Sequence, residues 1–172
     1  CDKVNSIQDD LFNKHGIEAY ICSNDHDFMQ LVCAEILVLR GYRGGLIMYN
    51  NTEVFNKFRI TPQQYLDYLA LVGDPSDNIK GVKGVGKKRA ISLLLEYGSI
   101  TKMYKSFDLL SPTLKKLLQN KEEDLKQRKD FLKINSKLKL NTGFNTKKYL
   151  LSKKSIPDKM GEFLTTHWEK II

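Results

Sequence analysis

The sequence predicts an α/β protein, and two observations support this. Short apolar runs at residues 19–22, 35–40 and 46–50 have the length and composition of buried strands. Other segments carry apolar side chains every three or four positions, which is the spacing of an amphipathic helix. Strands mixed with helices favour α/β over all-α. A chain of 172 residues suffices for one domain with a core, or for a compact body with a small appendage.

The first third of the chain alternates helix and strand. Apolar side chains three to four positions apart predict a helix over 2–15, which ends near Gly16. The run at 19–22 predicts a buried strand followed by a polar loop. The runs at 35–40 and 46–50 predict two more strands around a glycine-rich turn.

Residues 61–73 carry the clearest helix signals in the chain. Thr61 is a capping residue, Pro62 suits the first helical position, and Gln64 completes a capping box. A glycine at the end of this segment stops the helix. A short helix over 54–58 precedes it.

The second half of the chain is predicted to be mainly helical. Apolar spacing predicts a helix over 90–97 that is closed by Gly98, and residues 101–135 have a charged, helical pattern. The chain then returns as a strand at 137–144, and a terminal helix covers 160–168.

The composition favours an intracellular protein with a polyanionic partner. The formal charge is +8 and the isoelectric point is about 9.3. Cys1, Cys22 and Cys33 show neither CxxC spacing nor an even count, so we expect reduced thiols. Cytoplasm, nucleus and a DNA-containing organelle all fit. No apolar run approaches the roughly 20 residues that span a bilayer, so no membrane contact is expected.

Two pairs of aspartates are candidates for a metal site. Asp25 and Asp27 follow the first predicted strand, and in an extended segment both would face one metal position with His26 turned away. Asp74 and Asp77 lie just beyond a helix C-terminus, where the helix dipole disfavours anions and a divalent cation would compensate. Each pair alone is also typical of a turn. Two pairs together favour a metal site.

The segment "GVKGVGKK", Gly81 to Lys88, is a candidate phosphate-binding turn. It nearly matches a P-loop, but Lys88 stands where the hydroxyl should be, and a helix and an acidic loop precede it, so ATP binding is disfavoured. We expect instead a hairpin between two helices, pinned to the core by Val82 and Val85. Its backbone amides would meet a DNA phosphate at the next helix N-terminus. Metals at the adjacent acids would attract the same polyanion, which is the arrangement of a nuclease.

Two segments resemble the 5′-nuclease family. "ICSNDHDFMQLV" is similar to the family's (T/S)GDKDxxQLV element. "ITPQQYLDYLALVGDPSDNIKGVKGVGKKRAISLLLEYGS" is similar to its segment around GDSSDNIPGVPGIGxKTA. The resemblance covers residues 2 to about 145, is densest over 60–98, and is nearest the nuclease domain of bacterial DNA polymerase I. The family also includes phage 5′-exonucleases and flap endonucleases.

The resemblance implies a fold and an activity. The fold is the C-terminal part of a PIN-like 5′-nuclease core with a twisted, mainly parallel sheet, plus a helix–three-turn–helix segment. We expect a partial nuclease core over 1–78, a helix-hairpin-helix DNA-binding region over 79–135, and a return strand and helix over 136–172. The implied protein is a monomer that cuts 5′-flap, nicked or 5′-ended DNA with two Mg²⁺ or Mn²⁺ ions, with K⁺ at the hairpin.

The resemblance also implies the site residues. The metal-site acids are Asp2, Asp25, Asp27, Asp74 and Asp77, of which the last four are catalytic. The DNA-binding set is Gly81, Lys83, Gly84, Gly86, Lys87, Lys88 and Arg89. Asn24 stands at a family glycine, where asparagine tolerates a left-handed backbone.

The start of the chain departs from the family. Lys3 falls on the second aspartate of an E-x-D-D motif whose glutamate would precede Cys1. We therefore expect a fragment without the family's N-terminal part. The alternative function is a non-catalytic module that binds duplex DNA. An RNA-cleaving relative is disfavoured because of the glycine hairpin. The Lys-rich stretch Lys115–Lys133 is interpreted as a solvated helix face in preference to a second DNA-binding site.

Overall fold

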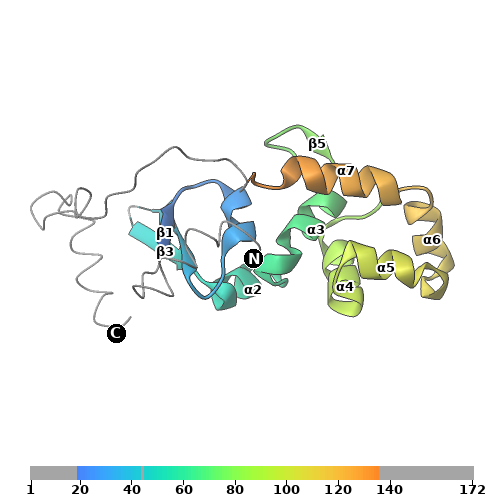
Figure 1. The fold of residues 1–172 in the computed structure, drawn as a ribbon, viewed down its shortest axis with the longest axis horizontal. Helices are drawn as coiled ribbons and strands as arrows, with labels where there is room; N and C mark the ends of the chain where they lie inside the picture. The colour runs from blue at the N-terminus through green and yellow to red at the C-terminus, as the bar shows by residue number, and fades with distance from the viewer. Residues whose placement is uncertain (1–18, 44, 136–172) are drawn as a thin grey trace, which may run out of the picture. The chain divides into compact units, whose positions relative to one another are not determined.

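The computed structural model describes residues 19–43 and 45–135. The predicted helix over 2–15, the acid Asp2 and the predicted region 136–172 lie outside the described residues. The described part confirms the α/β class, since a small sheet is followed by a helical region (Figure 1).

A three-stranded sheet forms the first part of the fold. It contains β1 (Ala19–Cys22), β2 (Ile36–Tyr42) and β3 (Gly45–Tyr49), in the order β1-β2-β3. β1 pairs parallel with β2, with Ala19 opposite Ile36, whereas β2 pairs antiparallel with β3. The described sheet is therefore mixed. The expected parallel pairing occurs at β1–β2, while the tight turn between β2 and β3 requires antiparallel pairing.

Seven α- or 3₁₀-helices of six or more residues occur in the described part of the chain. They are η1 (His26–Leu31), α2 (Asn51–Phe58), α3 (Pro62–Val72), α4 (Lys87–Tyr97), α5 (Ile100–Lys105), α6 (Pro112–Leu118) and α7 (Glu122–Leu132). A short turn, η2 (Phe107–Leu109), lies between α5 and α6. The predicted helix over 101–135 is thus divided into several pieces. Serine caps start two of them, because the hydroxyls of Ser99 and Ser111 accept bonds from backbone N–H groups.

The predicted start of α3 is confirmed. The backbone N–H of Thr61 donates to Gln64 Oε1 at 3.0 Å, as a capping box requires. Gln64 Nε2 also donates to the carbonyls of Leu94 and Gly98 at the end of α4. One side chain therefore fixes the start of α3 and the end of α4 together.

The core of the described residues is built around α3. Residues Leu69, Ala70 and Leu71 are at most 5% exposed, and α3 packs against η1, α4 and α7 (Figure 1). One hydrophobic cluster runs from Met29 to Leu132. Within residues 19–43 and 45–135, no helix combines the length and the hydropathy that crossing a bilayer demands.

Candidate metal centre beside a glycine hairpin

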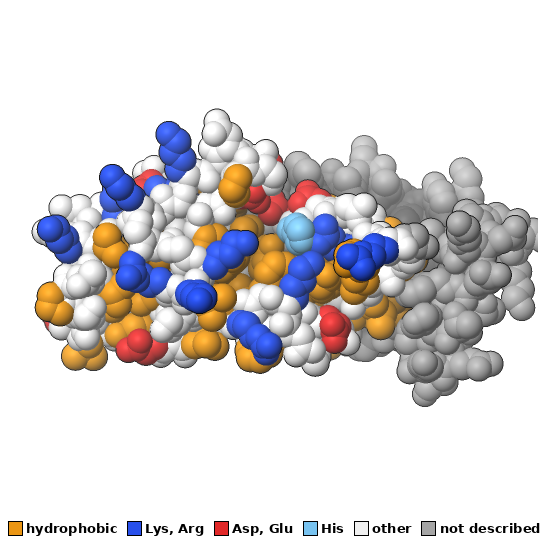
Figure 2. All heavy atoms as spheres, turned by 180° about the vertical axis from the view of Figure 1, so that it is seen from behind, with side chains coloured by type: hydrophobic (Ala, Val, Ile, Leu, Met, Phe, Trp, Pro, Cys, Tyr) orange, Lys and Arg blue, Asp and Glu red, His pale blue; other side chains and the backbone are white. Residues whose placement is uncertain are grey.

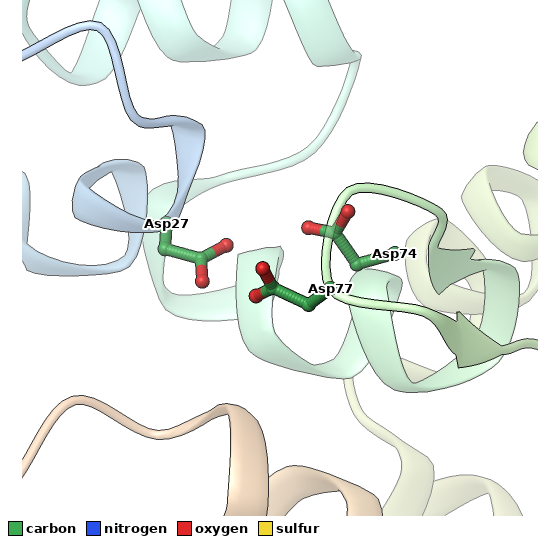
Figure 3. A group of neighbouring side chains, drawn as sticks. All are labelled: Asp27, Asp74 and Asp77. Carbon is green, nitrogen blue, oxygen red and sulfur yellow. The ribbon is translucent and has the colours of Figure 1, made fainter.

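Three aspartates from two segments meet at one point. Asp27 lies on η1, Asp74 is the last residue of β4 (Gly73–Asp74), and Asp77 lies on the loop between β4 and β5 (Ile79–Lys80). One carboxylate oxygen from each lies within 4.8 Å of the others, and the three side chains point toward a common space (Figure 3). The two predicted aspartate pairs therefore come together through three of their four members.

The loop that carries Asp74 is held by local bonds. The backbone N–H of Ser76 donates to Asp74 Oδ1 at 2.8 Å, and Ser76 Oγ donates to the same oxygen at 2.5 Å. Before the loop, Gly73 adopts φ +80°, and a Cβ there would lie 2.4 Å from the backbone of Gly81 and Ile79. Only glycine fits this crossing, which directs the chain from α3 into the acidic loop.

Asp25 has a different place from the one expected. Residues 26–31 form a 3₁₀-helix and not an extended segment, and Asp25 is its N-cap. Asp25 Oδ1 accepts the backbone N–H of Asp27 at 2.9 Å, so its carboxylate lies outside the group of three. His26 is not turned away. Its ring packs edge-on against Phe58, and its Nε2 contacts the guanidinium of Arg40.

Asn24 is also placed differently. Its backbone does not have positive φ, so the left-handed conformation expected at this position is not used. Its side-chain Oδ1 instead accepts the backbone N–H of Gly41 at 2.9 Å, and its carbonyl accepts a bond from Arg40 at 2.5 Å. These contacts tie the end of β1 to β2 directly before Asp27.

The charge of the group acts most strongly on Asp27. Burial, followed by the nearby carboxylates of Asp25, Asp74 and Asp77, raises the pKa of Asp27 to about 6. Asp27 Oδ1 is also buried without a hydrogen-bond partner. An orphaned, half-buried carboxylate facing two others is suited to a divalent cation with oxygen ligands, so these residues fit Mg²⁺ or Mn²⁺.

A hollow of about 540 Å³ adjoins the aspartates, and we call it the carboxylate hollow. Its lining includes Asn24, Asp25, His26, Phe58, Tyr65, Tyr68, Asp74, Ser76, Asp77 and Lys87. Phe58 of α2 and Tyr65 and Tyr68 of α3 form an aromatic wall of this hollow, which the sequence analysis did not predict. Burial and the charge of Asp27 raise the pKa of Tyr65, so its hydroxyl stays protonated.

The glycine hairpin follows β5 and leads into α4. Val82 and Val85 are buried, as predicted, and Val85 N–H donates to the carbonyl of Val82 at 2.9 Å. Gly84 adopts φ +85°, and its carbonyl accepts a bond from the Arg89 guanidinium. The hairpin is therefore a tight turn whose backbone faces the start of α4.

The glycines of the hairpin have different surroundings. A Cβ on Gly81 would lie 2.3 Å from the backbone of Val72, so the close approach of these two backbone segments requires glycine at this position. A Cβ on Gly86 would meet nothing within 4 Å. Gly86 is the N-cap of α4, so its open face and the free N–H groups of the first turn can approach an anion.

A second hollow of about 790 Å³ lies against the hairpin, and we call it the hairpin hollow. Its lining includes Gly84, Gly86, Lys87, Lys88, Arg89, Ser92, Glu96, Ser111 and Thr113. Lys83 is exposed but does not line it. Lys and Arg side chains are spread over one face of the described part, beside a small acidic patch (Figure 2).

Comparisons with known proteins agree with this geometry. A family model described as "5′-3′ exonuclease, C-terminal SAM fold" matches residues 60–156. A 5′-3′ exonuclease of Mycoplasma genitalium is 37% identical over 82% of this chain and 52% of that protein. A thermostable DNA polymerase I of Thermus thermophilus is 34% identical over 78% of this chain and 16% of that protein. The chain therefore spans about half of the length of the Mycoplasma relative.

A solved structure shares the fold. The flap endonuclease of phage T5, solved as a pseudo-enzyme-product complex with DNA and metal ions, matches with a TM-score of 0.62 and 20% identity. The match covers 72% of this chain and 45% of that one. The predicted nuclease-core fold is thus confirmed.

Proposed function

We propose, because the chain belongs to the 5′-3′ exonuclease family, that it hydrolyses DNA phosphodiester bonds as a 5′-3′ exonuclease and 5′-flap endonuclease. The observation that carries this proposal is the meeting of Asp27, Asp74 and Asp77 within 4.8 Å, next to the glycine hairpin. Carboxylates from two distant segments would repel one another without a cation between them.

The side chains have separate roles in this proposal. Asp27, Asp74 and Asp77 would hold two Mg²⁺ or Mn²⁺ ions, which would activate water and stabilise negative charge on the leaving oxygen. Ser76 orients the carboxylate of Asp74, and Asp25 positions Asp27 by capping η1. The aromatic wall of the carboxylate hollow excludes water from one side of the phosphate.

The hairpin supplies the contact to DNA in this proposal. Gly84 and Gly86 let a phosphate approach the backbone, while Lys83, Lys88 and Arg89 add charge that does not depend on sequence. K⁺ at the hairpin and a monomeric state are further parts of the proposal. The substrate is a 5′-flap, nicked or 5′-ended duplex, which the chain holds on its basic face.

The test uses a 5′-labelled flap duplex and the full chain with Mg²⁺ or Mn²⁺, with and without chelator. We expect cleavage that requires metal and falls at least about 100-fold in Asp74→Asn, because the change removes a metal ligand. Asp108→Asn, an exposed aspartate outside the site, is the control. Metal-dependent cleavage that persists in Asp74→Asn would contradict the site.

A second candidate function is a duplex-binding module without catalysis. It is favoured by Lys3, which falls where the family motif has an acid. In that case the chain would bind the flap duplex without cutting it. Asp74→Asn would then tighten binding, because one repulsive carboxylate is lost.

A further inference from the structure

We infer that Lys87 is a positioning residue for the phosphate that is cleaved, and not one more contact to the duplex backbone. The inference rests on the proposed function. It divides the basic residues of the hairpin into two kinds: Lys88 and Arg89, which hold the duplex, and Lys87, which acts at the aspartates.

The position of Lys87 separates it from its neighbours. Lys87 is the first residue of α4 and directly follows the open N-cap Gly86. It lines both the hairpin hollow and the carboxylate hollow. Lys88 and Arg89 line the hairpin hollow but not the other one. A strand that passes from the hairpin to the aspartates therefore reaches Lys87 on the way.

The carboxylate hollow is lined by more acidic than basic side chains. Among the residues that line the carboxylate hollow, Lys87 is the one Lys or Arg, whereas Asp25, Asp74 and Asp77 are acidic. The ion pairs found within the described residues are made by Lys126, Arg128 and Lys129, so none of these aspartates neutralises Lys87. Its ammonium is exposed and available to an incoming anion.

This arrangement gives Lys87 a defined effect on the reaction. A phosphate that enters the carboxylate hollow carries charge of the same sign as the aspartates, and an ammonium at the edge attracts it to the reacting position. The same charge contributes little to duplex affinity, which several other hairpin groups supply. Removing it should therefore slow cleavage of bound DNA more than it weakens binding.

The test compares Lys87→Gln, Lys88→Gln and Lys105→Gln, the last being an exposed lysine on α5 outside both hollows. Single-turnover cleavage of the flap duplex with Mn²⁺ at saturating chain gives the rate constant. Fluorescence anisotropy in chelator gives Kd. We expect K87Q to lower the rate constant about tenfold or more with Kd within about twofold. K88Q should instead raise Kd with little change in the rate constant, and K105Q should change neither quantity. The same pattern for K87Q and K88Q would overturn the inference.

A readout without DNA separates this inference from the proposed function. If the wild-type chain cuts no DNA, the proposed function fails for this chain. Mn²⁺ titration of the free chain then tests whether the Lys87 ammonium acts on the aspartates. A cation beside the aspartates repels Mn²⁺, so K87Q should raise Mn²⁺ affinity about threefold or more, while K88Q leaves it unchanged. Equal Mn²⁺ affinity in the wild type and K87Q would overturn the inference.

Discussion

The ammonium of Lys129 lies 2.5 Å from a carboxylate oxygen of Asp67, and this ion pair joins α7 to α3. Asp67 is only 4% exposed, so its charge is almost completely removed from water. Because α3 carries the aromatic wall and ends in the acidic loop, the pair supports the element that positions the metal centre. Lys129 lies in the Lys-rich stretch that the sequence analysis interpreted as a solvated face.

Breaking this ion pair should destabilise the folded chain. We expect Lys129→Met to lower the free energy of unfolding by about 2–3 kcal/mol, since it leaves a buried carboxylate without a partner. This value is below that of a fully enclosed pair because the Lys129 side chain stays 26% exposed. Urea unfolding followed by circular dichroism measures it. Lys126→Met is the matched control, because its exposed pair with Glu122 is worth less than about 0.5 kcal/mol. Equal losses in the two variants would refute the role of Asp67.

Gln30 makes two long-range hydrogen bonds. Its Nε2 donates to the carbonyl of Leu132 and its Oε1 accepts the N–H of Ile134, both at 3.1 Å. Gln30→Ala should cost about 1–2 kcal/mol of unfolding free energy, because two part-buried backbone groups lose their partner. Gln127→Ala, whose side-chain amide reaches only an exposed glutamate, should cost little. Hydrogen exchange of the Ile134 amide gives a local check. If the amide is as well protected from exchange in Gln30→Ala as in the wild type, the result would argue against these hydrogen bonds.

The sequence predicted those features that depend on neighbours in the chain. The capping box at Thr61, the helix end before Gly73 and the burial of Val82 all follow local rules and are confirmed. The extended segment expected at Asp25 was wrong, because the Asp25 side chain caps a 3₁₀-helix that starts at the next residue. Local capping overrode the strand alternation assumed for that stretch.

Long-range contacts could not be predicted from the sequence. The bonds of Gln30 link residues 102 and 104 positions apart, and no local pattern marks either partner. The same holds for Asp67, a charged residue at a buried helix position that only the packing of α7 explains. At the site, spacing predicted four aspartates, but only the fold shows that Asp27, and not Asp25, joins Asp74.

The raised pKa of Asp27 predicts a pH-dependent stability. Its value of about 6 in the folded chain exceeds the ordinary 3.8, so the folded state holds the proton more tightly. Stability from this group is therefore present at low pH and lost as the pH rises from about 3.8 to about 6. Above that range the charged carboxylate destabilises the fold, because it is partly buried and because the neighbouring carboxylates repel it. We expect Asp27→Asn to be more stable than the wild type at pH 7.5 in chelator, with the difference shrinking toward pH 4.

Chemical unfolding from pH 4 to pH 7.5 measures this difference, with Asp108→Asn as the control for losing an exposed aspartate. Mg²⁺ at pH 7.5 should stabilise the wild type and have a smaller effect on Asp27→Asn, because bound metal neutralises the group. A stability difference that does not vary with pH would contradict the raised pKa of Asp27.

Two glycines of the acidic and hairpin segments should separate folding from binding. Gly73→Ala should lower the unfolding free energy by at least about 3 kcal/mol, because φ is +80° and the new Cβ would clash with backbone. Gly86→Ala meets open space and should cost within about 1 kcal/mol. If a phosphate approaches the N-cap of α4, Gly86→Ala should nevertheless weaken duplex binding about threefold or more, measured by anisotropy at fixed salt. Unchanged duplex affinity in a folded Gly86→Ala variant would place the phosphate elsewhere.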